Sequence, residues 1–180
     1  MKRLTLLRHA KSSWDDHVPR DFDRPLNKRG ARAAATMGQY ARSRDMHFDY
    51  LIASPALRVT ETLDEFLEAY GQNVEANWDR RIYLASSATL MDVLRDIPED
   101  KSDLLMLGHN PGLEDLILSL VSDDGTSRLR DEVEVKFPTA SLAVIEIDVE
   151  KWNDVGPQTA KLACFIRPRD LDPTLGPDQY

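Results

Sequence analysis

The fold of this chain is decided near its start, by the stretch Leu4-Thr5-Leu6-Leu7-Arg8-His9-Ala10-Lys11. Its first four residues form a mostly apolar run with the length of a short buried strand, and the run stops at an arginine and a histidine side by side. In an open α/β sheet, ligands bind just beyond the carboxyl ends of the strands. We therefore expect Arg8 and His9 to face the mouth of a cleft, where they present a cation and a potential nucleophile.

Length and composition restrict the class of protein. At 180 residues, with 42% hydrophobic and 30% charged residues, the chain is expected to form one globular domain over residues 1–180 rather than a disordered or fibrous protein. No apolar run approaches the ~20 residues of a membrane span and no signal-peptide pattern opens the chain, so we expect a cytoplasmic protein with no membrane partner. The net charge of −8 argues against nucleic acid as a partner. Any phosphate binding must therefore come from a local cluster of cations.

Short apolar runs alternate with helical periodicities along the chain, which is typical of a layered α/β domain. Asn27 is placed to cap a helix from Lys28, and small residues such as Gly38 on one face of that helix let it approach its sheet closely. Ser54-Pro55 supplies a capping serine and a first-turn proline for a second helix. Strands are expected at Arg3–Leu7, Tyr50–Ala53, Asp103–Leu107, Ala140–Ile147 and Ala160–Ile166, an extended piece at Val74–Trp78, and helices at Lys28–Arg44, from Ser54 to Gly71, at Ser87–Ile97 and after Asn110-Pro111.

Two remaining segments show neither pattern. The stretch Ser122–Arg130 is interpreted as mobile. A tail punctuated by prolines, residues 168–180, is expected to be loosely ordered.

Three of the predicted strands are followed by side chains suited to phosphate chemistry, namely Arg8-His9, Arg58 and His109. If these strands run parallel, their carboxyl ends share one edge of the sheet, and the helix starts after Ser54 and Asn110 add free N–H groups there. Arg58 falls in the first turn of its helix, where the macrodipole disfavours a cation by roughly 0.3–1 kcal/mol. Unfavourable positions of this kind occur most often at functional sites. A pocket formed by these two arginines and two histidines suits a phosphoryl group.

Four motifs resemble, in order and spacing, the histidine phosphatase superfamily related to phosphoglycerate mutase: Leu7–Ala10 (LRHA), Arg24–Gly30 (RPLNKRG), Ser54–Thr62 (SPALRVTET) and Gly108–Pro111 (GHNP). The resemblance runs from residue 3 to about residue 147 and is strongest to the short SixA-type phosphohistidine phosphatases. It implies a three-layer α/β/α sandwich with a mostly parallel central sheet. The chain departs from the wider superfamily at one place, where Arg-His-Gly is Arg8-His9-Ala10, and this reduces the backbone freedom of the loop.

The resemblance also implies a mechanism. His9 would be the nucleophile, forming a phosphohistidine enzyme that water then hydrolyses, with no metal and no cofactor. Arg8, Arg58 and His109 would hold the non-bridging oxygens, with Lys11 as a further phosphate-binding candidate. The arginines favour a neutral His9, which is the form able to attack. The implied partner is a protein carrying phosphohistidine or a small phosphorylated substrate, with inorganic phosphate as the product.

The resemblance does not identify the residue that protonates the leaving group. Mutase-like members carry a glutamate after the third core segment, whereas Arg80–Ala85 has no carboxylate and only Asp79 precedes it. The other candidates are the acids Asp15, Asp16, Asp21 and Asp23 in the loop after His9, among which we select Asp21 as the general acid; solvated loop acids are the alternative. A phosphoramidate bond is labile and needs less proton transfer than an ester, so we expect phosphohistidine or a similarly activated phosphate as substrate.

Three other functions stay open at this point. His9, His109 and loop aspartates could form a metal site, although both arginines would then weaken metal binding. The chain could bind phosphorylated partners without turnover. It could also be a mutase or hydrolyse sugar phosphates. It lacks the long insertion that larger family members use as a substrate cap, so we expect an open site suited to a protein-borne group.

Overall fold

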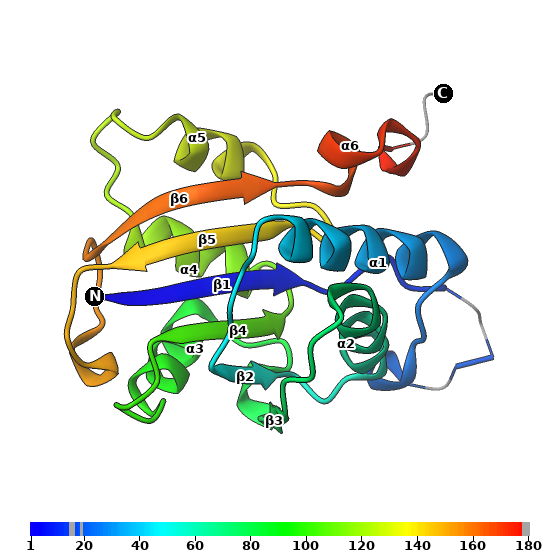
Figure 1. The fold of residues 1–180 in the computed structure, drawn as a ribbon, viewed down its shortest axis with the longest axis horizontal. Coiled ribbons are helices and arrows are strands. Elements are labelled where there is room, and N and C mark those ends of the chain that lie inside the picture. Colours follow the sequence, from blue (N-terminus) through cyan, green and yellow to red (C-terminus); the bar gives the residue numbers. More distant parts are fainter. Residues whose placement is uncertain (15–16, 19, 178–180) are drawn as a thin grey trace.

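The computed structural model describes residues 1–14, 17–18 and 20–177. Its centre is a six-stranded sheet with the order β3-β2-β4-β1-β5-β6 (Figure 1). The strands are β1 (Lys2–Arg8), β2 (Tyr50–Ala53), β3 (Ala76–Trp78), β4 (Asp103–Gly108), β5 (Leu142–Ile147) and β6 (Ala160–Ile166). The neighbours β3, β2, β4 and β1 are parallel, and β5 is antiparallel to both of its neighbours, β1 and β6, so the predicted mostly parallel sheet is confirmed.

The register of the parallel strands brings their carboxyl ends together. Arg8 lies opposite Gly108 across the β1–β4 ladder, and Ala53 lies opposite Leu107 across the β2–β4 ladder. The alignment continues past the strands, because the His9 backbone N–H donates to Gly108 O at 3.1 Å. The three strand ends that the sequence singled out therefore share one edge of the sheet, as predicted.

Helices cover both faces of this sheet (Figure 1). They are α1 (Lys28–Ser43), α2 (Leu57–Tyr70), α3 (Ser87–Arg95), α4 (Gly112–Leu120), α5 (Arg128–Val135) and α6 (Pro168–Leu171). Alternate strand residues divide the buried core into two layers, since Leu104 and Met106 pack with α3, α4 and α5, and Leu105 and Leu107 pack with α1 and α2. The predicted three-layer α/β/α arrangement is confirmed.

The helix starts agree with the sequence at α1 and differ at α2. Asn27 caps α1 as predicted, because its side-chain oxygen accepts the Gly30 backbone N–H at 2.7 Å. α2 begins at Leu57 with Ala56 as its N-cap, so the prediction that Ser54 caps it is wrong. Ser54 lies two residues before that cap, where its hydroxyl accepts the Ala56 backbone N–H at 3.3 Å and contacts His109 Nε2 at 2.8 Å.

The small-residue face of α1 shares a buried cluster with the sheet residues Leu7 and Leu105 through Ala34 and Met37, as predicted, but its glycine has another neighbour. A Cβ atom on Gly38 would lie 2.2 Å from the carbonyl oxygen of Phe66 in α2. The close approach that Gly38 permits is therefore to α2 rather than to the sheet. This contact fixes α1 and α2 to each other beside the strand ends.

Two segments are more regular than the sequence suggests. α5 begins inside the stretch interpreted as mobile, with Ser127 capping Arg130 N at 3.2 Å. The expectation of a loosely ordered tail does not hold over residues 168–175, which form α6 and a 3-10 turn, tied to α1 by a 2.7 Å bond from Arg32 to Thr174. Residues 178–180 of that tail lie outside the described residues. Within the described part of the chain, no helix is long and apolar enough to cross a membrane.

Candidate active site

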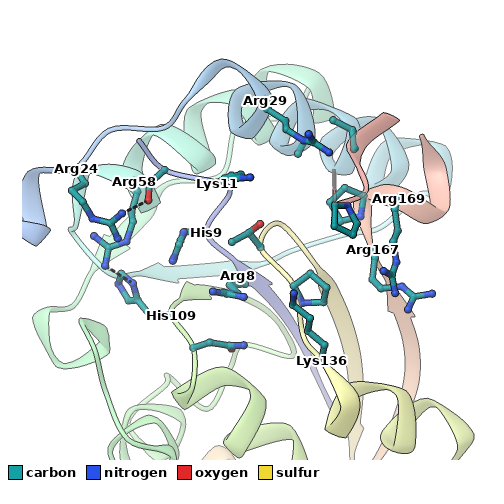
Figure 2. A pocket seen from close by; sticks show the side chains of 18 of the residues that line it. Arg8, His9, Lys11, Arg24, Arg29, Arg58, His109, Lys136, Arg167 and Arg169 are labelled. Atoms are coloured by element: carbon teal, nitrogen blue, oxygen red, sulfur yellow. Dashed lines mark hydrogen bonds between the residues drawn. The ribbon is translucent and has the colours of Figure 1, made fainter. Parts of the chain in front are cut away.

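A cavity of about 530 Å³ opens at the carboxyl ends of β1, β2 and β4. Its walls include Arg8 and His9 from the end of β1, Arg58 from the first turn of α2, and His109 from the loop after β4 (Figure 2). Residues from three separate parts of the chain thus converge on one site. The geometry of these four side chains determines what chemistry the site can support.

His9 is held with one particular ring nitrogen available. Its side chain is buried, with the residue only 8% exposed, and Nδ1 lies 2.8 Å from the carbonyl oxygen of Ala10. A carbonyl oxygen can only accept, so Nδ1 carries the proton and the neutral ring has its lone pair on Nε2. Burial lowers the pKa of His9 to about 4, with further lowering by the positive charges of Arg8, Arg58 and Arg24. Near pH 7 the ring is neutral and able to act as a nucleophile.

The loop after His9 is fixed from behind by α2. The Ala10 backbone N–H donates to Thr62 Oγ1 at 2.9 Å, and the Thr62 hydroxyl donates to the carbonyl oxygen of Arg58 at 2.6 Å. Positive φ angles at described non-glycine residues occur at four other positions and not at Ala10. The alanine that replaces the superfamily's glycine is therefore accommodated without backbone strain.

The two arginines are placed by contacts that use only part of their donor capacity. Arg8 donates from Nη1 to the carbonyl oxygen of Phe137 at 2.9 Å. Arg58, only 2% exposed, donates from Nη1 to Asp21 O at 2.8 Å and from Nη2 to Asp21 Oδ2 at 3.0 Å. Within the described residues the buried Nε atoms of both arginines have no hydrogen-bond partner. Two permanent cations with donors to spare therefore stand beside His9.

His109 completes the cluster and has the opposite tautomer from His9. Its Nδ1 lies 3.3 Å from Arg58 Nη2, which can only donate, so Nδ1 accepts and Nε2 carries the proton that it donates to Ser54 Oγ at 2.8 Å. Burial lowers the pKa of His109 to about 3, and the neighbouring His9 and Arg58 lower it further. The two imidazole rings are 5.3 Å apart between centroids.

Asp21 faces the same cluster as an ionised carboxylate. It accepts hydrogen bonds from Tyr83 Oη at 2.7 Å, Arg24 Nε at 3.0 Å and Arg58 Nη2 at 3.0 Å. Partial burial raises the pKa of Asp21, but the bond from Tyr83, the charge of Arg58 and the bond from Arg24 outweigh it and lower the pKa to about 2. Asp21 and an incoming phosphoryl group would compete for the same donors of Arg58.

The segment Arg24–Gly30 braces the loop after β1. Arg24 donates from Nη1 to Ser12 Oγ at 2.7 Å and stacks on Trp14, with its guanidinium carbon 3.8 Å from the ring centroid. A Cβ atom on Gly30 would lie 2.1 Å from the carbonyl oxygen of Lys11, so only glycine lets α1 start this close to the loop. This packing positions the backbone immediately after His9.

Comparison with known proteins identifies the family. Residues 4–81 match the family model of the histidine phosphatase superfamily, branch 1. An uncharacterized protein of Mycobacterium tuberculosis is 33% identical over 164 residues, covering 91% of this chain and 100% of that relative. This chain belongs to the histidine phosphatase superfamily.

Two solved structures place this histidine phosphatase in the SixA-type branch. A putative phosphohistidine phosphatase SixA from Agrobacterium tumefaciens has 28% sequence identity and a TM-score of 0.77, covering 93% of this chain and 98% of its own. A putative phosphohistidine phosphatase SixA from Nakamurella multipartitia has 27% identity and a TM-score of 0.81, covering 93% of this chain and 96% of its own. The phosphoglycerate mutase-like fold is thereby confirmed, and the comparisons support phosphatase activity.

The structure brings together most of the residues that the sequence singled out in this histidine phosphatase. Arg8, His9, Lys11, Asp21, Arg58 and His109 all line the cavity. Asp23 points elsewhere, since it accepts from Arg20 at 2.7 Å and is not among the lining residues, and Asp15 and Asp16 lie outside the described residues. In the described part of the chain, no group of three or more His, Cys, Asp or Glu residues is placed to hold a metal ion.

Sequence reasoning missed three members of the site. It assigned Ser54 a capping role, although Ser54 bonds to His109, and it gave Arg24 no role of its own. It searched Arg80–Ala85 for a carboxylate, whereas the contributing residue there is Tyr83, which bonds to Asp21. Asp79 instead caps the 3-10 turn Arg80–Ile82 and pairs with Arg81. The available signal was Tyr83 itself, the one hydroxyl side chain in Arg80–Ala85.

Proposed function

We propose that this histidine phosphatase hydrolyses phosphohistidine on a protein, or a similarly activated phosphate, through a covalent phosphohistidine intermediate on His9. The observation that carries the proposal is the Nδ1–Ala10 hydrogen bond, because it leaves the Nε2 lone pair of a neutral ring beside the buried Arg58 and the half-buried Arg8. Nucleophile and phosphate-binding cations are thus arranged before any substrate arrives.

In the first step the Nε2 lone pair attacks phosphorus, and the bond from phosphorus to the substrate's nitrogen breaks with its electron pair going to that nitrogen. Arg8 and Arg58 hold the non-bridging oxygens, the Nε2–H of His109 turns from Ser54 Oγ to one of these oxygens, and Lys11 adds a cation at the mouth of the site. The phosphoryl group displaces the Asp21 carboxylate from Arg58. Water then attacks the phosphoenzyme, which releases inorganic phosphate and restores neutral His9.

The choice of an activated substrate rests on Asp21. A carboxyl group with a pKa near 2 holds no proton near pH 7, so the described geometry disfavours Asp21 as a proton donor. A phosphohistidine can take a proton from solvent on its other ring nitrogen and leave as neutral imidazole, whereas an alkyl ester must expel an alkoxide. A site with an ionised Asp21 suits the first kind of leaving group. The general-acid role of Asp21 stays a prediction.

The test combines trapping with a substrate panel. Wild-type protein incubated with a ³²P-phosphohistidine peptide and quenched in alkali is expected to carry label on His9, and His9→Ala is expected to carry none and to lose activity by about 10⁴-fold or more. Activity is expected to persist in a chelator. Comparable kcat/KM values for phosphohistidine and for alkyl phosphate monoesters would contradict the substrate assignment. Unlabelled His9 in an active enzyme would contradict the mechanism.

A further inference from the structure

The cavity continues well beyond the residues proposed to hold the phosphoryl group. On the far side of His9 it is lined by four basic side chains, Arg29, Lys136, Arg167 and Arg169, which we call the basic arm. Figure 2 shows Arg24, Arg58 and His109 on one side of His9, the basic arm on the other side, and Lys11 between them. The arm is assembled from the start of α1, the end of α5 and the junction of β6 with α6.

The charge of this cavity is opposite to the charge of the chain. Its described lining contains eight Lys and Arg side chains and one carboxylate, that of Asp21, whereas the whole chain has 23 Lys and Arg against 31 Asp and Glu. A single phosphoryl group carries at most two negative charges, and Arg8 and Arg58 already match them. The basic arm therefore exceeds what one phosphoryl group requires, and its positive field extends the site toward a further anionic group.

Two side chains of the basic arm are far more exposed than Arg58 beside His9, whereas Arg29 and Arg167 are half-buried like Arg8. Lys136 and Arg169 are exposed, and within the described residues the Lys136 ammonium group has no hydrogen-bond or ion-pair partner. Arg167 is paired with Asp170 at 2.9 Å, which offsets part of its charge. A second phosphate of a small substrate would call for buried, convergent donors like those of Arg58. Exposed cations spread over several elements are typical of the rim of a protein interface, where they steer a charged partner.

Resting on the proposed function, we propose that the basic arm binds carboxylate side chains that flank the phosphorylated histidine of a protein substrate. The partner's phosphohistidine enters beside His9, and its neighbouring Asp and Glu residues lie along Lys136 and Arg169. The arm acts on association of the acidic segment and leaves the chemical step to His9. Its contribution is therefore to kcat/KM, decreases with salt, and is absent for a substrate that has no flanking residues.

The experiment uses the full chain and two histidine-phosphorylated peptides of equal length, one with glutamates around the phosphohistidine and one with glutamines in their place. Phosphoimidazole serves as a substrate without flanks. The arm variant is Lys136→Gln with Arg169→Gln. The matched control is Lys151→Gln with Lys161→Gln, which removes the same charge from exposed lysines outside the cavity.

At low ionic strength the wild type is expected to prefer the acidic peptide by about tenfold in kcat/KM, and the preference is expected to shrink as salt is added. The arm variant is expected to lower that preference to about twofold or less and to hydrolyse phosphoimidazole at the wild-type rate. The control is expected to keep the full preference.

Equal kcat/KM for the two peptides would overturn this inference while leaving the proposed function intact. So would an arm variant that keeps the preference, or one that slows phosphoimidazole as much as the acidic peptide. Failure of wild type to hydrolyse any phosphohistidine substrate, with no label on His9, would instead overturn the proposed function.

Discussion

Both ends of the cavity are positively charged, but the two ends differ in how far their cations are buried. Beside His9, Arg58 is almost fully buried, its donors are directed by hydrogen bonds, and its contacts with Asp21 and His109 fix one geometry. In the basic arm, Lys136 and Arg169 are exposed on separate elements. The first arrangement is built to stabilise charge at defined atoms, and the second can only raise the local potential.

This difference suits the buried end of the cavity to the chemical step and the exposed end to the association of a charged partner. Buried, oriented cations act at low local dielectric, where each is worth more than in water and needs no reorganisation during the reaction. Exposed cations are screened by salt and change association more than the chemical step.

The largest effect is expected at Arg58. Arg58→Ala should lower kcat/KM for phosphoimidazole by about 10³-fold, because it removes a buried cation and two directed donors from the developing negative charge. Arg58→Lys should recover only a small part, since an ammonium group cannot reproduce the planar fork. Steady-state kinetics would check both variants. Arg3→Ala, which removes a guanidinium paired with Asp103 at the far end of β1, serves as a control and should be close to wild type. A loss below about tenfold in Arg58→Ala would abolish the distinction between the two ends of the cavity.

A smaller effect is expected at Gly30. In Gly30→Ala the new Cβ would meet the Lys11 carbonyl oxygen at 2.1 Å, and backbone atoms must move to relieve the overlap. We expect a loss of about 1–3 kcal/mol in the free energy of unfolding and roughly tenfold in kcat/KM, because the displaced segment follows directly on His9. Chemical denaturation and kinetics measure the two losses. Gly156→Ala, whose new methyl group would have no atom within 4 Å, should change neither. A Gly30→Ala protein with wild-type stability and wild-type kcat/KM would refute the packing role assigned to Gly30.

The smallest effect concerns pH. Because burial and neighbouring arginines lower the pKa of His9 from 6.5 to about 4, its ring should stay neutral with the proton on Nδ1 between about pH 5 and 7. The folded pKa lies below the unfolded one, so the stability that neutral His9 contributes is present above pH 6.5 and is lost as pH falls to about 4. Imidazole ¹⁵N spectra, assigned with His9→Ala, would show this. A His9 ring that protonates near pH 6.5 would contradict the described burial.

Much of the site could be predicted from the sequence because its signals are local. The apolar run before Arg8 predicts a strand, and Gly71 after a helical period predicts a helix end, where the structure has φ 77°. The unfavourable position of Arg58 in a first helical turn predicts a special environment, and the structure buries that arginine against Asp21. Each of these inferences depends on residues within about one or two turns of each other.

The contacts that complete the site join residues that are far apart in the sequence. Ser54 bonds to His109, and Tyr83 bonds to Asp21, across separations of 55 and 62 residues. No local pattern specifies such pairs, because they depend on how α1, α2 and the sheet pack.

By itself, the sequence determined the layered α/β class and the strand and helix ends that carry Arg8, His9, Arg58 and His109, since strand length, helix period and dipole are properties of neighbouring residues. The parallel sheet that gathers these four residues was implied by the resemblance of the four motifs to a known family. Only the tertiary structure decided the tautomers of the two histidines, the ionised state of Asp21 and the assembly of the basic arm. Those features follow from burial and from distances between remote segments, which exist only once the chain has packed.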